Sequence, residues 1–497
     1  MTAVGTPRYQ EQRLARTKIV ATVGPACASR EMLSELVIAG VDLFRLNFAH
    51  GSHEWLSGIV AHIRDISRET QRPIGILGDL SGPKIRLGIL PDDGIVCHDG
   101  AEFLFIRGME RKAANELCCT YKSLIDDVRV GDRVLLADGC VAMRVLEQDA
   151  VNGVARCVVE VAGMIRSKQG INLPGVKLSM PSLTDKDRLD LAWAIREEID
   201  FVGLSFVRAA VDVTELRQVI RDSAPHSKLR IIAKIEKPEA LDELEAIVNV
   251  SDAVMVARGD LGVEIDIFRV PTVQKQLIKL CNQKRIPVIT ATQMLDSMQR
   301  NELPTRAETS DVANAVLDGT DAVMLSGETA AGLYPRQSVA MMSRICHEAE
   351  KLLPLSRVTE DLARLETQAM EITEAVAVGA VATAEKLNAD LIAVATLTGR
   401  AAQAISKERS RVPVLAICGS PQTARQLTLL WGITPVEAVA SEHGGEDVVT
   451  QAVEWGRREK VLESGSRVVV VASSRWSSAG HDSMLVHLVD QCGVGGD

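Results

Sequence analysis

The sequence predicts an α/β protein: a closed (β/α)8 barrel of the TIM type, with an inserted small β-barrel domain and a C-terminal α/β domain. Three observations support this prediction. Eight short apolar runs, most of them separated by helix-like segments, suit parallel strands that are buried on both faces. The third and fourth runs stand much farther apart than their neighbours. After about residue 360 the pattern changes to a second α/β unit.

The eight runs are rich in β-branched and aliphatic residues, and their length is typical of strands. They span residues 18–24, 41–48, 73–80, 200–207, 230–236, 253–261, 287–294 and 322–329. In a closed parallel barrel the carboxyl ends of all strands open onto one mouth, where active sites lie. The alternation therefore places these distant residues near one small volume: Arg45, Asn47, Asp79, Lys234, Glu236, Asp260 and Thr292.

The segment between the third and fourth runs, from Leu80 to Asp200, is too long for a structureless loop in a compact barrel. It contains short alternating stretches separated by Asp-Gly, Asn-Gly and Gly-Asp pairs, which indicate antiparallel hairpins. We expect a small inserted β-barrel domain over residues 88–180. Because both of its ends join the barrel mouth, this domain is placed to act as a lid.

The C-terminal part predicts a separate open α/β domain over residues 359–497. A helix is expected over 371–389, and strands over 390–397, 412–419 and 467–473. The catalytic barrel is then formed by residues 1–87 and 181–358.

The composition narrows the class of protein. The chain has 497 residues, a net charge of −10 and no long basic run, which argues against a nucleic-acid partner. Aromatic residues make up 3%, so the cores must be aliphatic. No signal peptide and no apolar stretch of about 20 residues is present, which argues against a membrane span. The ten cysteines show no metal-binding spacing, as expected for free thiols in a reducing cytoplasm.

Two acids predict a site for a hard divalent cation. Glu236 and Asp260 are expected at the ends of adjacent strands, where their oxygens can coordinate one Mg2+. The alternative is a pair of surface acids, which is the ordinary interpretation for either acid alone. Lys234 lies two residues before Glu236, so on a strand both point to the same side. An ammonium there can stabilise charge on a transferring phosphoryl group or an enolate.

Cationic groups gather around the same mouth. The stretch RLNFAHG supplies Arg45, Asn47 and His50, and GDLSGPKIRLG supplies Lys84 and Arg86. In ARGDLG, glycines let backbone N–H groups approach an anion. A metal ion together with several cationic side chains fits a substrate that carries more negative charge than a single carboxylate. This excess of positive charge favours phosphoryl transfer as the reaction.

The chain resembles the pyruvate kinase family along nearly its whole length. The matching stretches include KIVATVGPA, FRLNFAHG, AKIE, VARGDLGVE, TATQMLDSM and DGTDAVMLSGETA. The resemblance implies transfer of phosphate from phosphoenolpyruvate to ADP in glycolysis, which gives pyruvate and ATP. It also implies two Mg2+ ions during turnover, one bound by the protein and one with the nucleotide, and a cytoplasmic homotetramer.

The resemblance further implies roles for individual residues. Glu236 and Asp260 would hold the protein-bound Mg2+, Arg45 the transferring phosphate, and Lys234 would stabilise the phosphoryl group and the enolate. Gly259 and Asp260, with Thr292, would hold the substrate carboxylate, and Thr292 and Ser326 would lie near the path that protonates the enolate. The residues implied for ADP and its metal are Asn47, His50, Arg86 and Lys186.

Two positions depart from the potassium-dependent pattern of the family. Ala49 replaces a serine that ligates K+, and Lys84 replaces a glutamate, preceded by Leu80 and Ser81. We expect the Lys84 ammonium to supply the charge of a bound K+, helped by Asp79 and Asn47, because a second cation would be repelled. The enzyme is then independent of K+. The alternative is that Lys84 points to solvent.

The stretch ATLTGRAAQ predicts an allosteric anion site at the start of a helix in the C-terminal domain. Its residues are Thr396, Thr398, Gly399 and Arg400, and the family often binds an activating sugar phosphate here; a nucleotide effector is also considered. Leu397 and Ala401 stand where polar residues are commoner, and residues 473–480 are expected as the opposing wall. The alternative is an ordinary turn that contains glycine.

Two other functions fit part of the pattern. A Mg2+-dependent barrel lyase or aldolase acting on a pyruvate enolate could share the acids and the glycine-rich loop, but it needs no nucleotide residues and no lid. An inactive metabolite sensor would be free to lose Lys234 or a metal acid, and this chain keeps them.

Overall fold

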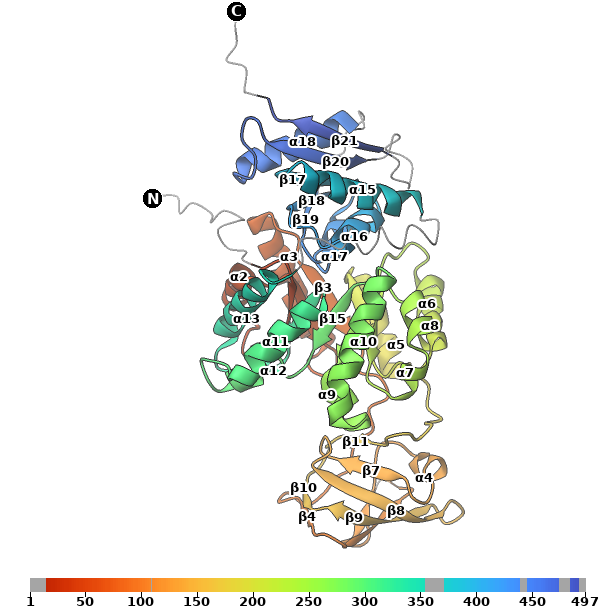
Figure 1. Cartoon of the computed structure of the whole chain (residues 1–497). Helices are drawn as coiled ribbons and strands as arrows, with labels where there is room; N and C mark the ends of the chain where they lie inside the picture. The colour runs from red at the N-terminus through yellow and green to blue at the C-terminus, as the bar shows by residue number, and fades with distance from the viewer. Residues whose placement is uncertain (1–14, 109, 354–370, 439–444, 473–482, 491–497) are drawn as a thin grey trace, which may run out of the picture.

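The computed structural model describes residues 15–108, 110–353, 371–438, 445–472 and 483–490. Its central unit is a closed barrel of eight parallel strands, which confirms the predicted fold class. Figure 1 shows the inserted β-rich segment at the bottom, the barrel in the middle and the C-terminal domain at the top. The insert and the C-terminal domain therefore lie at opposite ends of the barrel.

Each predicted apolar run contains one barrel strand, and the strands follow one another around the barrel in chain order. They are β1 (Lys18–Thr22), β2 (Leu43–Asn47), β3 (Gly75–Asp79), β12 (Phe201–Leu204), β13 (Arg230–Ile235), β14 (Ala253–Ala257), β15 (Val288–Ala291) and β16 (Ala322–Leu325). Most of them are buried along their whole length. The strands thus end together at the mouth.

The ends of two runs were assigned incorrectly. Residues 258–261 belong to helix α9 (Arg258–Glu264), and residues 327–329 belong to the short helix α12 (Gly327–Ala330). Asp260 therefore lies in the first turn of a helix and not at the tip of a strand. The sequence RGDLG follows the last buried strand residue directly, so the chain turns into the helix as soon as it leaves the barrel.

Helices cover the outside of the barrel, and several begin at side-chain caps. Thr184 and Asp187 form a capping box at the start of α5 (Asp185–Arg196), and Thr305 and Glu308 form one at the start of α11 (Arg306–Asp318). The helices are α2 (Arg30–Ala39), α3 (His53–Thr70), α5 (Asp185–Arg196), α6 (Ala210–Ser223), α7 (Glu239–Asp242), α8 (Leu244–Val250), α10 (Val270–Gln283), α11 (Arg306–Asp318) and α13 (Pro335–Glu350), with 3-10 turns η1 (Ile267–Arg269) and η2 (Asp296–Gln299).

The inserted segment is β-rich and has a hydrophobic core of its own. A six-stranded sheet has the order β11-β7-β8-β9-β5-β6, and β10 pairs with β4. Its elements are β4 (Ile95–Cys97), β5 (Glu102–Ile106), β6 (Glu116–Leu117), α4 (Leu124–Asp127), β7 (Arg133–Leu136), β8 (Val141–Asp149), β9 (Val154–Val161), β10 (Gly163–Ile165) and β11 (Ile171–Asn172). We refer to this segment as the lid.

The C-terminal domain has a five-stranded sheet in the order β19-β18-β17-β20-β21. Its elements are α15 (Ile372–Lys386), β17 (Leu391–Thr396), α16 (Arg400–Lys407), β18 (Val414–Cys418), α17 (Pro421–Leu427), β19 (Ile433–Glu437), α18 (Gly445–Arg458), β20 (Arg467–Ala472) and β21 (Ser483–Leu488). Two strands of this sheet were not predicted from the sequence: β19, which contains Pro435, and the exposed antiparallel edge strand β21. The predicted boundary at 358/359 lies outside the described residues.

The C-terminal domain packs on the amino ends of the barrel strands. Lys407 Nζ lies 2.5 Å from Asp321 Oδ2, next to the start of β16. Arg425 Nε lies 2.7 Å from Asp200 Oδ1, and Lys18 Nζ donates to the carbonyl of Ile433 at 2.6 Å. These buried polar contacts join the domain to the barrel at three strands.

Within the described ranges, no helix combines the length and apolar character that crossing a membrane requires. All the cysteines that the structure describes are free thiols.

Candidate active site

A cavity of about 310 Å3 opens at the carboxyl ends of the barrel strands, beneath the lid. We call it the mouth cavity. Its lining includes these residues that the sequence analysis singled out: Arg45, Asn47, Ala49, His50, Asp79, Leu80, Ser81, Lys84, Arg86, Lys186, Lys234, Glu236 and Asp260. The closed barrel thus brings together residues from β2, β3, β13, the lid connections and helices α5 and α9.

Asp79 is the anion that orders two cations. Its Oδ2 accepts from Arg45 Nη2 at 2.5 Å and from Nε at 2.9 Å, and its Oδ1 lies 3.2 Å from Lys234 Nζ. Burial tends to raise the pKa of Asp79, but Lys234 and Arg45 outweigh it and hold the pKa below its ordinary value. Asp79 is therefore a carboxylate that fixes both cations.

A glycine on the neighbouring strand makes this arrangement possible. Gly203 on β12 pairs in register with Asp79 on β3. A Cβ atom at position 203 would lie 2.8 Å from Asp79 Oδ1 and 3.6 Å from Lys234 Cδ. Because Gly203 has no side chain, it leaves the space that the Asp79–Lys234 pair occupies. The sequence pattern alone did not indicate this role of Gly203.

Lys234 and Glu236 point to the same side, as predicted from their spacing. Lys234 Nζ lies 2.9 Å from Glu236 Oε1 and donates to Ser205 Oγ at 2.7 Å. Burial tends to lower the pKa of Lys234, but the two carboxylates Asp79 and Glu236 raise it above its ordinary value. Lys234 therefore stays an ammonium, held over the cavity by three oxygen groups.

Glu236 and Asp260 lie close enough to repel each other. Burial raises the pKa of Glu236, Lys234 lowers it, and the negative charge of Asp260 raises it further. Glu236 Oε2 accepts from the backbone N–H of Phe206 at 2.8 Å, and the Asp260 side chain is 32% exposed to the cavity. Two neighbouring carboxylates beside open space are a donor set that fits Mg2+, which takes one or two carboxylates and keeps water or substrate oxygens. The described residues contain no larger group of His, Cys, Asp and Glu that could hold a metal.

Thr292 and Gly259 contact each other beyond β15. The Gly259 N–H donates to Thr292 Oγ1 at 2.7 Å, so the two predicted carboxylate-binding groups are adjacent. Thr292 and Gln293 have positive φ angles of 67° and 52°. For Thr292, which is β-branched, this backbone conformation is strained. The Arg258 guanidinium donates to the carbonyl of Thr292 at 2.8 Å and pairs with Asp311 at 2.7 Å. Arg258 stabilises this turn, a role that the sequence analysis did not assign.

Ser326 follows the last residue of β16. Its Oγ atom is buried and makes no hydrogen bond within the described part of the chain, while its backbone N–H donates to Glu328 at 2.7 Å. Neither Ser326 nor Thr292 lines the mouth cavity.

The residues implied for ADP all line the mouth cavity. Lys186 Nζ contacts the carbonyl of Phe48 and Asp190 Oδ2, each at 2.6 Å. Asn47 Oδ1 accepts from the N–H of Ala49 at 3.0 Å, and Arg86 donates to the carbonyl of Lys168 in the lid at 3.2 Å. His50 is exposed.

Lys84 lines the mouth cavity, and its ammonium lies 3.8 Å from Asp260 Oδ1. Its predicted partners Asp79 and Asn47 line the same cavity, but the described contacts of Asp79 are with Arg45 and Lys234. The charge of Lys84 therefore adjoins the acid pair more closely than it adjoins Asp79.

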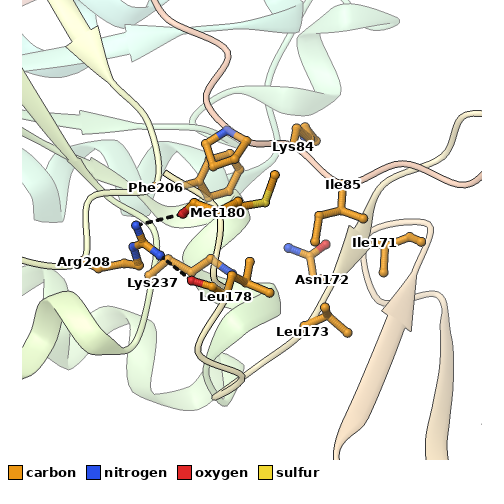
Figure 2. A pocket seen from close by; sticks show the side chains of 11 residues that line it. Lys84, Ile85, Ile171, Asn172, Leu173, Leu178, Met180, Phe206, Arg208 and Lys237 are labelled. Carbon is orange, nitrogen blue, oxygen red and sulfur yellow. Dashed lines mark hydrogen bonds between the residues drawn. The ribbon is translucent and has the colours of Figure 1, made fainter. Parts of the chain in front are cut away.

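Figure 2 shows the junction between barrel and lid, where a small cavity of about 30 Å3 lies. Arg208 donates to the carbonyls of Leu178 and Met180 at 3.0 and 3.3 Å, the dashed lines in the figure. These bonds tie the chain that returns from the lid to the barrel.

The buried carboxylate of Glu264 connects the lid to the two segments that carry Glu236 and Asp260. Glu264 of α9 accepts from Lys237 Nζ at 2.7 Å and from Asn172 of the lid strand β11 at 2.9 Å. Lys237 follows Glu236, and α9 carries Asp260. Glu264 therefore joins both elements that supply the acid pair and connects them to the lid.

The predicted anion-site residues of the C-terminal domain lie between the last residue of β17 and the first residue of α16. Thr396 Oγ1 is buried and accepts from the Gly399 N–H at 2.9 Å. Arg400 is largely exposed and lies 3.4 Å from Glu371, while Thr398 is exposed on the loop. The expected opposing wall, residues 473–480, lies outside the described residues.

Two family models match this chain: "Pyruvate kinase, barrel domain" over residues 14–339 and "Pyruvate kinase, alpha/beta domain" over residues 374–487. A pyruvate kinase of Staphylococcus epidermidis is 42% identical over 481 residues, which cover 96% of this chain and 81% of that protein. One from Staphylococcus aureus is 41% identical over the same shares. The crystal structure of a pyruvate kinase from Cryptosporidium parvum superposes with a TM-score of 0.90 at 35% identity, covering 98% of this chain and 99% of that one.

Proposed function

This chain belongs to the pyruvate kinase family and has that family's enzyme activity, and we propose that it transfers phosphate from phosphoenolpyruvate to ADP at the mouth cavity in the glycolytic direction. The observation that carries the proposal is Lys234, a buried ammonium between Asp79 and Glu236 and next to the acid pair. Phosphoryl transfer depends mainly on positioning and on charge stabilisation, which this arrangement provides.

Glu236 and Asp260 are the residues that would hold the protein-bound Mg2+, which would supply positive charge for the phosphate and enolate oxygens. Arg45 binds the transferring phosphoryl group through its guanidinium, whose orientation is set by Asp79. Lys234 stabilises negative charge on the phosphoryl oxygens and then on the enolate oxygen of pyruvate. Gly259, Asp260 and Thr292 hold the substrate carboxylate, and Thr292 and Ser326 lie near the path by which a proton reaches the enolate carbon.

Asn47, His50, Arg86 and Lys186 bind the phosphates of ADP, which brings the second Mg2+. Support for this assignment comes from the mouth cavity, which all four residues line together with Arg45 and Lys234. Lys84 replaces the charge of a monovalent cation, so that K+ is not required. Its ammonium at 3.8 Å from Asp260 places a fixed positive charge beside the acid pair.

Further proposals concern the molecule as a whole. The chain divides into a barrel of residues 1–87 and 181–358, a lid of 88–180 and a C-terminal domain of 359–497. It acts in the cytoplasm as a homotetramer, an assembly typical of the family, and a phosphorylated metabolite regulates it through the C-terminal domain. The residues proposed for that site are Thr396, Thr398, Gly399 and Arg400.

The central test is pyruvate formation from phosphoenolpyruvate, followed with a lactate dehydrogenase coupling reaction in the presence and absence of ADP. Lys234→Met removes the ammonium and is expected to lower kcat by at least about 100-fold, because it removes stabilisation of the transition state. Lys279→Met, at an exposed lysine of α10, is the matched control and should keep the wild-type rate. Wild-type activity without ADP, or an active Lys234→Met variant, would contradict the proposal.

A further inference from the structure

The residues proposed for the substrate carboxylate come from two segments that are far apart in the chain. Gly259 and Asp260 lie in the first turn of α9, whereas Thr292 lies in the turn that follows β15. A carboxylate that contacts both segments needs them at a fixed separation. The side chain of Arg258, the first residue of α9, reaches from one segment to the other.

The turn after β15 has a backbone conformation that is unfavourable in isolation. Thr292 and Gln293 both have φ angles in the left-handed region, which residues with a side chain rarely adopt. Such residues persist only where the surrounding contacts hold them in place. The turn must therefore be held by groups that lie outside it.

The Arg258 guanidinium supplies contacts of this kind. Its Nε atom lies 3.2 Å from the carbonyl oxygen of Ala291 and 3.3 Å from that of Thr292. Its Nη2 atom donates to the carbonyls of Thr292 and Gln293 at 2.8 and 3.3 Å. One planar group thus contacts the carbonyl oxygens of three consecutive residues, which include both residues of the strained turn.

The remaining nitrogen of Arg258 is anchored by an acid on another helix. Nη1 lies 2.8 Å from Oδ1 and 2.7 Å from Oδ2 of Asp311 on α11, and it donates to Gln274 Oε1 of α10 at 3.3 Å. The side chain of Arg258 is 10% exposed and does not line the mouth cavity. Arg258 therefore acts on the substrate through the turn that it holds.

We propose that Arg258 is a positioning residue for the substrate carboxylate and that Asp311 is the anchor that orients it. This inference rests on the proposed function, in which Gly259, Asp260 and Thr292 hold the carboxylate of phosphoenolpyruvate. The Gly259 N–H lies 2.7 Å from Thr292 Oγ1, so the two segments meet directly beside the guanidinium. Arg258 keeps them in this relation, and its loss separates them.

The role depends on the shape of the guanidinium and not on its charge alone. Guanidinium donates from a rigid planar fork, whereas a lysine ammonium donates from a single point. Lysine at position 258 keeps the positive charge, but it cannot contact Asp311 and three backbone carbonyls at once. A displacement of about 1 Å in a binding group can cost about 100-fold in rate, so a loosened turn should weaken substrate binding strongly.

The test measures binding without turnover, by isothermal titration calorimetry of the full-length protein in the presence of Mg2+. One probe is phosphoenolpyruvate, titrated without ADP, and the other is ADP, titrated without phosphoenolpyruvate. Arg258→Lys should weaken phosphoenolpyruvate binding at least tenfold and leave ADP binding within twofold of the wild type. The matched control Arg269→Lys makes the same change at an exposed arginine of η1 and should alter neither affinity.

Asp311→Asn provides a second variant, at a side chain that is 39% exposed and so tolerates replacement. It should weaken phosphoenolpyruvate binding about three- to tenfold, because Arg258 loses its anchor, and should leave ADP binding unchanged. In the double variant Arg258→Lys/Asp311→Asn the losses should be less than additive, since both residues act through one turn. In steady-state kinetics the KM for phosphoenolpyruvate should rise in the same order, while the KM for ADP stays within twofold.

Phosphoenolpyruvate binding to Arg258→Lys with wild-type affinity would overturn the positioning role. Equal weakening of phosphoenolpyruvate and ADP would also overturn it, because that result indicates general damage to the fold. Fully additive losses in the double variant would reject Asp311 as the anchor. If the wild type itself binds no phosphoenolpyruvate, the proposed function fails and this inference fails with it. Wild-type binding together with an unaltered Arg258→Lys variant rejects the role of Arg258 alone, so the two failures are distinguishable.

Discussion

Single residues at the mouth differ in how tightly their surroundings hold them. Asp79 is fixed by two cations and by the space beside Gly203, so its position is determined by packing as well as by charge. The Lys84 ammonium lies 3.8 Å from Asp260 Oδ1 and its side chain is 39% exposed, so its contribution is mainly a charge near the acid pair. Asp79 should therefore be sensitive to changes in packing, and Lys84 to changes in charge.

Gly203→Ala should damage the active site without unfolding the barrel. A Cβ atom at 2.8 Å from Asp79 Oδ1 forces that carboxylate to move, and Arg45 and Lys234 move with it. A displacement of this kind is expected to lower kcat/KM by about 10- to 100-fold. The measurement is steady-state kinetics together with circular dichroism.

The matched control for this change is Gly58→Ala on helix α3, where an added Cβ would meet no atom within 4 Å. It should keep full activity and lose no stability, because alanine favours a helix more than glycine does. If Gly203→Ala keeps wild-type kinetics, the packing argument for Asp79 fails.

Lys84→Glu should create a requirement for K+. The wild type is expected to show equal rates with K+ and with tetramethylammonium, because the Lys84 ammonium supplies the charge. In the variant a carboxylate replaces this charge, so activity falls in tetramethylammonium and recovers when K+ is added. Lys122→Glu, at an exposed lysine of the lid, makes the same charge change away from the mouth and should respond to neither ion. Strong activation of the wild type by K+ would contradict the role of Lys84.

At the scale of elements, Glu264 is the point where β13, α9 and the lid strand β11 meet. Its carboxylate is completely buried, and Lys237, beside it, also contacts the ring of Phe206 at 5.8 Å. A buried ion pair adds little to stability by itself, but breaking one partner of it is expensive. The junction therefore fixes the geometry of the acid pair as long as both charges remain.

Glu264→Gln should lower the free energy of unfolding by about 3 kcal/mol, because Lys237 is left as a buried charge without its counter-ion. The double variant Lys237→Gln/Glu264→Gln removes both charges and should recover much of that loss. Urea denaturation of the wild type, both single variants and the double variant gives the coupling energy. Additive losses across the four proteins would show that the two residues do not act as a pair.

At the scale of the whole molecule, the C-terminal domain is joined to the barrel by buried charges. Lys407 and Arg409 both contact Asp321, whose carboxylate lies at the amino end of β16. Burial lowers the pKa of Lys407 to about 8, with Asp321 opposing this shift and Arg409 adding to it. The domain contact therefore contains a lysine that loses its proton more readily in the folded protein than in the unfolded chain.

This shift predicts a pH dependence with a definite sign. Between about pH 8 and pH 10 the unfolded chain binds more protons at Lys407 than the folded chain does, so stability from this residue rises with pH. Relative to Lys407→Met, the wild type should gain roughly 1.4 kcal/mol of unfolding free energy per pH unit across this window. Urea denaturation at several pH values gives the difference. A difference that stays constant or shrinks as pH rises would contradict the assignment.

The barrel, the position of the insert and the central strands of the C-terminal sheet could be predicted from the amino-acid pattern, because buried parallel strands leave a continuous apolar pattern and an insertion interrupts it. The same pattern predicted which charged residues lie at the mouth, since every strand of a closed barrel ends there. The missed strands β19 and β21 show the limit: one contains a proline, and the other is an exposed edge whose pairing gives no apolar run.

The contacts of each charged residue could not be predicted in this way, because they depend on the folded arrangement of the chain. The sequence gives no sign that Asp79 holds both Arg45 and Lys234, that Gly203 makes room for them, or that Arg400 lies by Glu371. Such contacts join residues far apart in the chain, and their distances depend on how strands and domains pack. Local residue patterns record which groups are present, whereas packing sets the distances on which their electrostatic interactions depend.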